Sequence, residues 1–252
     1  MTTEIDIKET TVHETGLLKK SGGQFALVAL TAAHMEQILA LQEAAFKSLA
    51  ADEQHYLLQK DRGFFTRHFA HGGAVIGVVA DGKLVAQSIV FNPSAAHPAS
   101  GMTDMAISAQ PEQLTVLEGV VVDPAYRGNK LMDVMVRHWL GQAAQNGRTE
   151  ALAEVAVENA FSWSVFLKEG LHIESLGTDP ADNSVLYNLH GHIPDLKAAF
   201  NTAAKKQEDV STSDLARQKE LLAQGHKGVA HDRAKDTLTF AQRKKACGGF
   251  GL

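Results

Sequence analysis

The sequence predicts a mixed α/β fold, in which a sheet of about seven strands carries helices on both faces. Apolar segments with strand periodicity alternate with helical segments along residues 25–192. The two-residue turn Asp81-Gly82 separates two apolar runs and predicts an antiparallel hairpin. The strand–helix–strand order of residues 114–157 predicts a parallel pair beside that hairpin, with helices covering the sheet.

Length and composition are those of a folded globular protein. The chain has 252 residues, of which 44% are hydrophobic, and this is ample for a packed core. Cys247 is the only cysteine, so we expect no intramolecular disulfide and no cysteine-based zinc site. The polar, acidic N-terminus and the short apolar runs predict neither a signal peptide nor a transmembrane segment. These features together favour a cytoplasmic location and no membrane partner.

Charge is distributed unevenly along the chain. Residues 1–192 contain 13 Lys and Arg against 22 Asp and Glu, whereas residues 193–252 contain 11 against 7. A nucleic-acid-binding domain normally has a basic surface, so the acidic body argues against nucleic acid as a partner. The mildly basic tail is either a solvated helical face or a surface that docks on the body or on a partner.

Turn and cap residues, together with apolar periodicity, predict the first elements. Residues 1–24 lack apolar periodicity, so we expect a loose N-terminal arm. A short strand is predicted at 25–30, and a helix follows it to about residue 49, with Thr31 as the N-cap. A second helix is predicted over about 53–70 and ends at His71-Gly72-Gly73.

The period then changes from helix to strand. Strands are predicted at 74–80 and 84–91, followed by a loop over 92–113 and a buried strand at 114–122. The helix after this strand has one apolar face and ends at Asn146-Gly147. That face consists of Met132, Met135, Val136, Trp139, Leu140 and Ala143.

The second half of the predicted sheet comes next. We expect a strand at 150–157, a short helix at 159–169, and two further strands at 171–177 and 185–190.

The tail is predicted to be helical. Its expected helices cover about 195–207, 213–223 and 232–245. The predicted domains are therefore the arm 1–24, a domain over 25–192, and a helical C-terminal extension over 193–252.

The junction after the strand at 114–122 is a candidate ligand-binding site. Arg127-Gly128 lies where the strand gives way to the helix. A helix N-terminus leaves about four backbone N–H groups without partners and bears a partial positive charge, so it suits a phosphate group. Gly128 would let the backbone approach such a ligand closely.

Two sequence blocks carry a family resemblance. The first is V-x-P-x-Y-R-G at 122–128. The second begins at Glu154-Val155 and continues with Asn159, Ser162, Phe166, Gly170 and Leu171. In this order and on these elements, the blocks resemble the GNAT superfamily, the acyl-CoA-dependent N-acetyltransferases, over roughly residues 25–189. The resemblance implies a mostly antiparallel sheet of seven strands with a splayed parallel central pair.

The resemblance also implies acetyl-CoA as acyl donor and names its binding residues. Loop and first-turn amides would hold the pyrophosphate, and the pantetheine arm would lie along the fourth strand. The implied cofactor-binding residues are Val120, Val121, Val122, Arg127, Gly128, Asn129, Lys130, Leu131, Met132, Asn159, Ser162 and Phe166.

The chain departs from the family pattern at two of these positions. The family has R-x-x-G-x-G/A, whereas this chain has Lys130 and Met132 in the two small-residue slots. Lys130 would either contact the pyrophosphate as a point charge or crowd the pocket. Met132 fits the apolar helix face and is expected to pack in the core.

Acetyl transfer to an amine needs a group that accepts the amine proton and a group that returns a proton to the thiolate. Glu118 is the first candidate base, because strand alternation would place it on the same face as Val120 and Val122. The competing interpretation of Glu118 is a strand-edge residue bonded to a neighbouring N–H. Phe166 occupies the slot in which the family often has a tyrosine acid, and Tyr187 is the alternative donor. A backbone N–H near Val121 is expected to stabilise the developing oxyanion.

The histidines form two close pairs in sequence, His68 with His71 and His190 with His192. Neither pair has a nearby third ligand, so no metal site is predicted.

The sequence thus predicts an N-acetyltransferase that uses acetyl-CoA in a ternary complex. Its acceptor would be the amine of a small molecule or a protein. The alternative is a non-catalytic GNAT-like module that binds acyl-CoA or a protein partner. The tail would pack on the sheet or form a homodimer contact.

Overall fold

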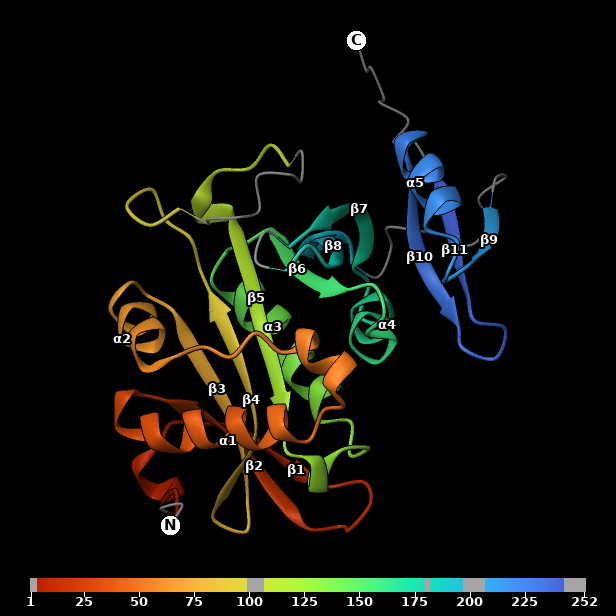
Figure 1. Cartoon of the computed structure of the whole chain (residues 1–252). Helices are drawn as coiled ribbons and strands as arrows, with labels where there is room; N and C mark the ends of the chain where they lie inside the picture. Colours follow the sequence, from red (N-terminus) through yellow and green to blue (C-terminus); the bar gives the residue numbers. More distant parts are fainter. Residues whose placement is uncertain (1–3, 99–106, 180–181, 197–206, 243–252) are drawn as a thin grey trace.

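A computed structural model describes residues 4–98, 107–179, 182–196 and 207–242 (Figure 1). The α-helices are α1 (Met35–Lys47), α2 (Arg62–Ala70), α3 (Leu131–Gln145), α4 (Ala160–Lys168) and α5 (Leu215–Ala223). The 3-10 helices are η1 (Ile7–Glu9), η2 (Ala32–His34), η3 (Ala51–Tyr56), η4 (Pro111–Gln113), η5 (Pro124–Tyr126) and η6 (Ile193–Asp195).

The strands of the described chain form one sheet. They are β1 (Val12–Leu17), β2 (Gln24–Leu30), β3 (Ala74–Ala80), β4 (Lys83–Phe91), β5 (Leu114–Val122), β6 (Glu150–Ala156), β7 (His172–Thr178), β8 (Val185–His192), β9 (Gln207–Ser211), β10 (His226–Asp232) and β11 (Thr237–Gln242). Their order in the sheet is β1-β2-β3-β4-β5-β6-β8-β7-β10-β11-β9. Every pairing is antiparallel except that of β5 with β6.

The prediction of seven strands is wrong, because the described part of the sheet has eleven. The seven predicted strands correspond to β2 through β8. The additional strands are β1, which precedes them, and β9, β10 and β11, which follow them. The predicted mixed α/β class and the parallel central pair are confirmed.

The N-terminal segment is part of the sheet rather than a loose arm. β1 pairs antiparallel with β2, from Val12 opposite Val28 to Leu17 opposite Gln24. Most of its side chains are exposed, so it lacks the apolar alternation by which a strand is recognised in sequence. Backbone pairing at the sheet edge orders it instead.

The predicted helix over 53–70 is also divided in the structure. η3 ends at Tyr56, and α2 begins only at Arg62. The Asp61 carboxylate accepts a hydrogen bond from the Phe64 amide at 2.6 Å, so an N-cap starts a new helix there.

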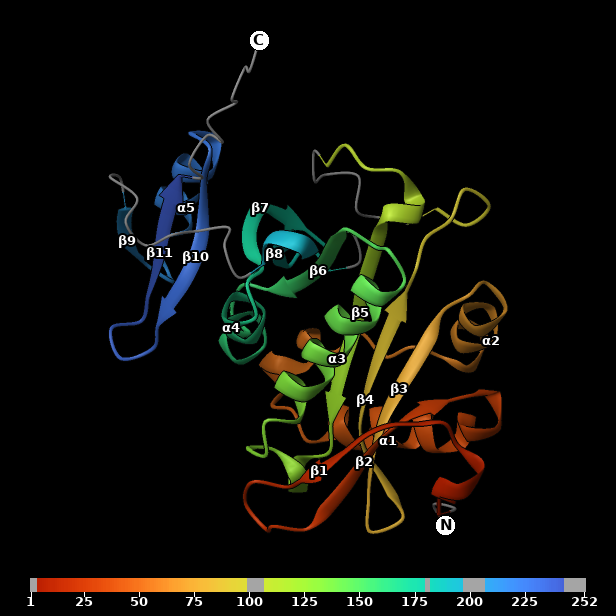
Figure 2. The same cartoon turned by 180° about the vertical axis from the view of Figure 1, so that it is seen from behind.

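Helices cover both faces of the sheet, as the two opposite views show (Figures 1 and 2). α1 and α2 pack on one face through Ile38 and Phe65, in a core cluster that also holds Val28 and Val121. On the other face, α3 contributes Met135 to a cluster with strands β2, β3 and β4. The predicted placement of helices on both faces is confirmed.

The central parallel pair is splayed. β5 and β6 pair only from Leu114 opposite Glu150 to Leu117 opposite Ala153. Both strands continue beyond these pairs, β5 to Val122 and β6 to Ala156, without pairing with each other. This divergence opens a wedge at the carboxyl ends of the two strands.

The C-terminal extension is a β-α-β-β unit, so the prediction of a wholly helical extension is wrong. Its predicted helix at 213–223 agrees with α5, and most of the one at 195–207 lies outside the described residues. The predicted helix at 232–245 is replaced by β11, in which Leu238 and Phe240 are buried on one face with the period of a strand.

The C-terminal unit continues the sheet and the core. β10 joins β7 at Gly228 opposite Ile173. Val210, Leu221, Leu238 and Phe240 belong to the same apolar cluster as residues of α3 and α4. Among the described residues, none of the helices has the length and apolar character needed to cross a bilayer.

Candidate functional site

Two cavities meet at the wedge between β5 and β6. The inner cavity, of about 400 Å³, reaches between the diverging strands and is bordered by α2 and η3 residues. The outer cavity, of about 1060 Å³, runs along the N-terminus of α3. Both lie in the size range of small-molecule sites. The residues that line both cavities are Tyr56, Leu57, Val120, Val121, Asn159 and Ser162.

The loop before α3 presents backbone N–H groups to the outer cavity. Gly128 has φ +82° and Lys130 has φ +59°, so two left-handed residues turn the chain into the helix. Within the described chain, no hydrogen bond takes up the backbone N–H groups of residues 128–132. These amides and the positive end of the α3 dipole suit a phosphate group.

Asn129 fixes the shape of this loop. It is buried, its Oδ1 accepts a hydrogen bond from the Lys20 amide at 2.8 Å, and its Nδ2 donates to the Tyr126 carbonyl at 2.9 Å. A buried, fully engaged amide side chain holds the loop instead of contacting a ligand directly. The Asn129 side chain therefore positions the loop, and its backbone N–H remains one of the unpaired groups described above.

Lys20 is a candidate binding residue that the sequence did not reveal. A Cβ at position 128 would lie 2.6 Å from Lys20 Nζ, so Gly128 leaves room for this ammonium beside the loop. Lys20 takes part in no salt bridge between described residues. The pairing of β1 with β2 and the hydrogen bond of its amide to Asn129 place it here, and residues 1–24 carry no sequence signal of that pairing.

The three other basic or bulky residues of the motif differ in orientation. Arg127 Nη2 donates to Ser48 Oγ at 2.9 Å and so binds the end of α1. Lys130 is exposed and lines the outer cavity, which its side chain does not close. Met132 is half-buried against the core and borders the same cavity.

Glu118 lies in a β-bulge. Ile89 of β4 pairs with Gly119 and Val90 pairs with Leu117, so Glu118 is the extra residue on β5. A bulge breaks strand alternation. The prediction that Glu118 shares a face with Val120 and Val122 is therefore wrong: Val120 and Val122 pack toward α3, whereas Glu118 points to α2.

The Glu118 side chain lines the inner cavity and contacts the buried His68 of α2. His68 Nδ1 lies 3.3 Å from Glu118 Oε2, and Glu118 remains 27% exposed. Burial raises the pKa of Glu118, an effect that Lys60 opposes, and burial lowers the pKa of His68. Both shifts favour the neutral forms, and a carboxyl group with a raised pKa that lines a cavity is a candidate for proton transfer.

His68, for which the sequence predicted no functional role, is buried beside Glu118. Its Nε2 lies 3.3 Å from the Ala74 carbonyl, which leaves Nδ1 directed at Glu118. Gly73 makes this packing possible, because a Cβ there would lie 2.4 Å from the imidazole ring. The contact depends on how α2 packs on β5, which a single sequence does not indicate.

Tyr187 lies away from both cavities. It is fully buried, its hydroxyl donates to Gln218 Oε1 at 2.7 Å, and its ring packs edge-on against Trp163. Burial raises the pKa of Tyr187 far above its usual range. Among the described residues it therefore joins α5 to the core and does not reach the wedge, contrary to the predicted role as proton donor.

Tyr56 is a candidate acid that the sequence did not indicate. It lines both cavities and lies in η3, where its ring is 4.5 Å from that of His55. Burial, and then Glu158, raise the pKa of Tyr56, so the phenol keeps its proton at neutral pH. Phe166, in the usual tyrosine slot, lines the inner cavity and packs edge-on against Trp139.

Asn159 and Ser162, two predicted cofactor-binding residues, line both cavities. Asn159 caps α4, since its Oδ1 accepts a hydrogen bond from the Ser162 amide at 3.2 Å. Ser162 is half-buried. The second sequence block thus places two polar residues at the wedge.

The C-terminal unit supplies a wall of the outer cavity through Val229, Ala230, His231 and Arg233. His231 Nδ1 lies 2.8 Å from Ser164 Oγ, and the Arg233 guanidinium lies 5.1 Å from the centre of the Phe161 ring. Phe161 is 80% exposed, which is unusual for so large an apolar side chain. Because the tail was predicted to be helical, this hairpin was not expected from the sequence.

Comparison with known proteins agrees with this geometry. The model of the acetyltransferase (GNAT) family matches residues 33–171, more than half of the chain. No curated protein sequence matches the chain at a significant level.

Solved structures share the fold. The GNAT domain of S. lividans PAT has a TM-score of 0.52 and 15% identity, over 75% of this chain and 99% of that one. A putative acetyltransferase from Salmonella typhimurium, yncA, solved with its cofactor acetyl-CoA, has a TM-score of 0.50 and 14% identity, over 67% and 94%. The ribosomal-protein-S18-alanine N-acetyltransferase from Escherichia coli has a TM-score of 0.51 and 12% identity, over 67% and 98%.

Proposed function

Because the chain belongs to the GNAT family of acetyltransferases, we propose that it transfers an acetyl group from acetyl-CoA to an amine by direct attack in a ternary complex. The observation that carries the proposal is the meeting of two cavities at the wedge, below a loop of free backbone N–H groups. One cavity would hold the donor and the other the acceptor.

The residues of the outer cavity fit a CoA diphosphate. The backbone N–H groups of 128–132 would bind its oxygens, and the ammonium groups of Lys20 and Lys130 lie near enough to the loop to add charge. The part of β5 that β6 leaves unpaired, Glu118–Val122, offers backbone groups to the amides of a pantetheine arm.

Acetyl-CoA supplies an activated acyl group when bound. Glu118 would accept the proton of the attacking amine, with His68 holding the carboxyl group in place. A backbone N–H of β5 near Val121 would stabilise the negative charge that develops on the acyl oxygen. Tyr56 would donate a proton to the leaving thiolate, because it is the phenol at the junction of the two cavities.

Two tyrosine variants test the assignment of the acid. Tyr56→Phe removes the proposed donor and should lower kcat about 10²-fold, with little change in acetyl-CoA affinity. Tyr187→Phe removes an equally small group but lies in the core, so it should lower thermal stability and leave kcat unchanged. The measurement is release of free CoA thiol under saturating substrates. A loss of kcat in Tyr187→Phe alone would contradict the assignment.

The overall function is tested by titration calorimetry with acetyl-CoA, followed by mass spectrometry of a panel of amines. Binding followed by acetylation of at least one amine is the expected result. Folded protein that does not bind acetyl-CoA would refute the proposal.

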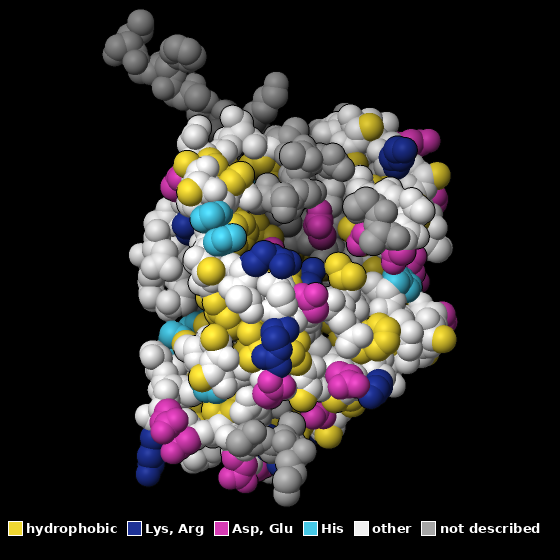
Figure 3. Space-filling view, turned by 60° about the vertical axis from the view of Figure 1, so that its left-hand side comes forward, with side chains coloured by type: hydrophobic (Ala, Val, Ile, Leu, Met, Phe, Trp, Pro, Cys, Tyr) yellow, Lys and Arg dark blue, Asp and Glu magenta, His cyan; other side chains and the backbone are white. Residues whose placement is uncertain are grey.

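The acceptor we propose is the amine of a small molecule or a protein. The surface over α1 and α2 mixes dark blue, magenta and yellow side chains without a field of one sign (Figure 3). Neither a strongly acidic nor a strongly basic acceptor is favoured by such a surface.

A second candidate function is a non-catalytic module that binds acyl-CoA or a partner. Phe166 in the usual tyrosine slot and the left-handed Lys130 in a glycine slot favour it. This module would bind acetyl-CoA without turning it over on any amine.

A further inference from the structure

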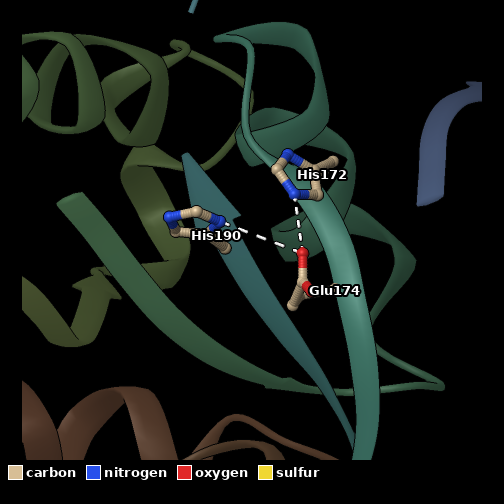
Figure 4. A group of neighbouring side chains, drawn as sticks. All are labelled: His172, Glu174 and His190. Atoms are coloured by element: carbon tan, nitrogen blue, oxygen red, sulfur yellow. Dashed lines mark hydrogen bonds and ion pairs between the residues drawn. The ribbon is translucent and has the colours of Figure 1, made fainter. Parts of the chain in front are cut away.

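Three side chains of neighbouring strands converge on one point of the sheet (Figure 4). His172 and Glu174 come from β7 and His190 from β8. His172 Nε2 lies 2.9 Å from Glu174 Oε2, and His190 Nδ1 lies 3.9 Å from the same oxygen. All three atoms are within 4.8 Å of one another.

Pairing of β7 with β8 creates this convergence. His172 lies directly opposite His190, so the two imidazoles share a face. The register then shifts between Ile173 and Ser175, which makes Glu174 an extra residue in a β-bulge. Bulges re-aim side chains, and here the carboxylate oxygen Oε2 is aimed between the two rings.

We propose that His172, Glu174 and His190 form a binding site for a divalent transition-metal ion, with zinc as the best-matched ion. Two imidazole nitrogens and one carboxylate oxygen are a common zinc ligand set, with a fourth position open to water. Ligand atoms around a tetrahedral zinc ion lie about 3.3 Å apart, because the metal–ligand bonds are about 2.0–2.2 Å long. The observed separations need only small side-chain adjustments to match.

The surroundings are those of a supported metal site. His190 uses its other ring nitrogen, Nε2, for a contact of 2.7 Å to Glu150 Oε2, and Glu150 Oε1 contacts His192 Nδ1 at 2.7 Å. Metal-binding histidines typically donate their second N–H to a carboxylate in this way, which fixes the ring. His172 is buried, whereas Glu174 is partly exposed and gives an ion access.

The positive charge of Lys227 opposes the binding of a cation, but its ammonium group does not occupy the space between the three ligand atoms. Its ammonium pairs with Glu174 Oε1, the oxygen that points away from the histidines. A metal-bound carboxylate commonly has its second oxygen hydrogen-bonded, so Lys227 can remain in place. Because Lys227 belongs to β10, an ion here would connect β7 and β8 to the C-terminal unit through Glu174.

The prediction of no metal site rested on the absence of a third ligand near His190 and His192 in sequence. His172 and Glu174 supply the missing ligands, and His192 binds Glu150 instead. The site does not depend on acetyl transfer. It lies near the paired end of β6, where Leu152 is opposite His190, and not at the wedge.

The test uses the full chain without a histidine tag, freed of metal with a chelator. Titration with Zn²⁺ by calorimetry, and with Co²⁺ by visible absorption, should show one equivalent bound per chain. Glu174→Gln keeps the shape of the side chain and should weaken zinc binding more than about 100-fold. Glu150→Gln, which removes the support of His190, should weaken binding about 10–100-fold.

His71→Ala is the matched control. His71 stacks on His97 with ring centres 4.1 Å apart, so it belongs to another close histidine pair of the described chain. Zinc binding should be unchanged in this variant and lost in His190→Ala, and Glu174→Gln decides the matter if His190→Ala does not fold. Absence of stoichiometric binding, or equal binding by wild type and Glu174→Gln, would overturn the proposal.

Discussion

At the scale of single residues, Glu118 and His68 form the pair to which we assign the proton transfer of the proposed reaction. They come from a strand and a helix that are far apart in sequence. Burial raises the pKa of the carboxyl group and lowers that of the imidazole, because a buried site disfavours the charged form of each.

Glu118→Gln should lower kcat by about 10²–10⁴-fold, because the amide cannot accept a proton. The base is active only when ionised, so wild-type kcat/KM should rise with pH through a pKa above the usual glutamate range. That rise should disappear in the variant. The measurement is a pH–rate profile, with the exposed Glu36→Gln on α1 as control. An unchanged profile in Glu118→Gln would show that another group is the base.

Lys130 has a left-handed backbone conformation, and this allows its charge and its bulk to be separated. Lys130→Ala and Lys130→Gly both remove the ammonium, but only glycine relieves a backbone cost of roughly 1–2 kcal/mol. If the ammonium contacts the diphosphate, both variants should bind CoA about 5–10-fold more weakly. Calorimetry measures the affinity. Tighter binding by Lys130→Gly than by wild type would show that the side chain obstructs the pocket.

Residue types in the two motifs were readable from the sequence, but their partners were not. Arg127, Gly128, Asn159 and Ser162, which the sequence predicts to bind the cofactor, all border the outer cavity. Lys20 could not be predicted, because its place beside Gly128 depends on strand pairing at the sheet edge. Tyr187 was predicted to reach the wedge from its strand alone, yet its hydroxyl turns to Gln218 of α5.

At the scale of elements, two β-bulges each place a glutamate beside a histidine. The bulge at Glu118 directs a carboxylate to His68, and the bulge at Glu174 directs one between His172 and His190. Strands 74–80 and 114–122 were predictable from their β-branched runs, and in the first of them nearly every residue is buried, which leaves a strong signal. A bulge has no such signature, so strand alternation gave the wrong face for Glu118.

The hairpin of β10 and β11 brings Arg233 to the outer cavity. Its guanidinium lies over Phe161, and Arg233 forms no salt bridge with any described residue. We expect it to bind the 3′-phosphate of CoA, because a guanidinium recognises phosphate with two parallel hydrogen bonds.

Arg233→Ala should therefore weaken CoA binding about 10-fold, or about 1.4 kcal/mol, and leave the binding of 3′-dephospho-CoA unchanged. Calorimetry with the two ligands measures this difference. Equal losses for both ligands would indicate that Arg233 acts by holding the hairpin in place.

At the scale of the whole molecule, one apolar core crosses the predicted boundary at residue 193. Phe240 and Leu238 of the C-terminal unit share a cluster with Trp139 and Trp163. Apolar residues of the C-terminal unit thus pack against the middle of the chain. Periodicity in a single sequence shows which residues are apolar but not what they contact. This is why the tail was predicted to be a separate helical extension.

Phe240→Ala should lower the free energy of unfolding of the whole chain by about 3–5 kcal/mol, because it leaves a cavity in that core. Urea unfolding should show one transition, with tryptophan fluorescence and circular dichroism changing together. Phe161→Ala, at an exposed phenylalanine, should cost less than about 1 kcal/mol. Separate transitions for the two probes would show that the C-terminal unit unfolds independently.

The short parallel ladder between β5 and β6 has a consequence for the protein without a bound ligand. Only four residue pairs join the two strands, from Leu114–Glu150 to Leu117–Ala153. Beyond Leu117, the backbone N–H groups of β5 that are not hydrogen-bonded to β4 are open to water. They should therefore exchange readily in deuterium oxide. A ligand that binds in the wedge and forms hydrogen bonds with these amides would slow that exchange. The middle of the sheet would then become rigid only when the acyl donor is bound.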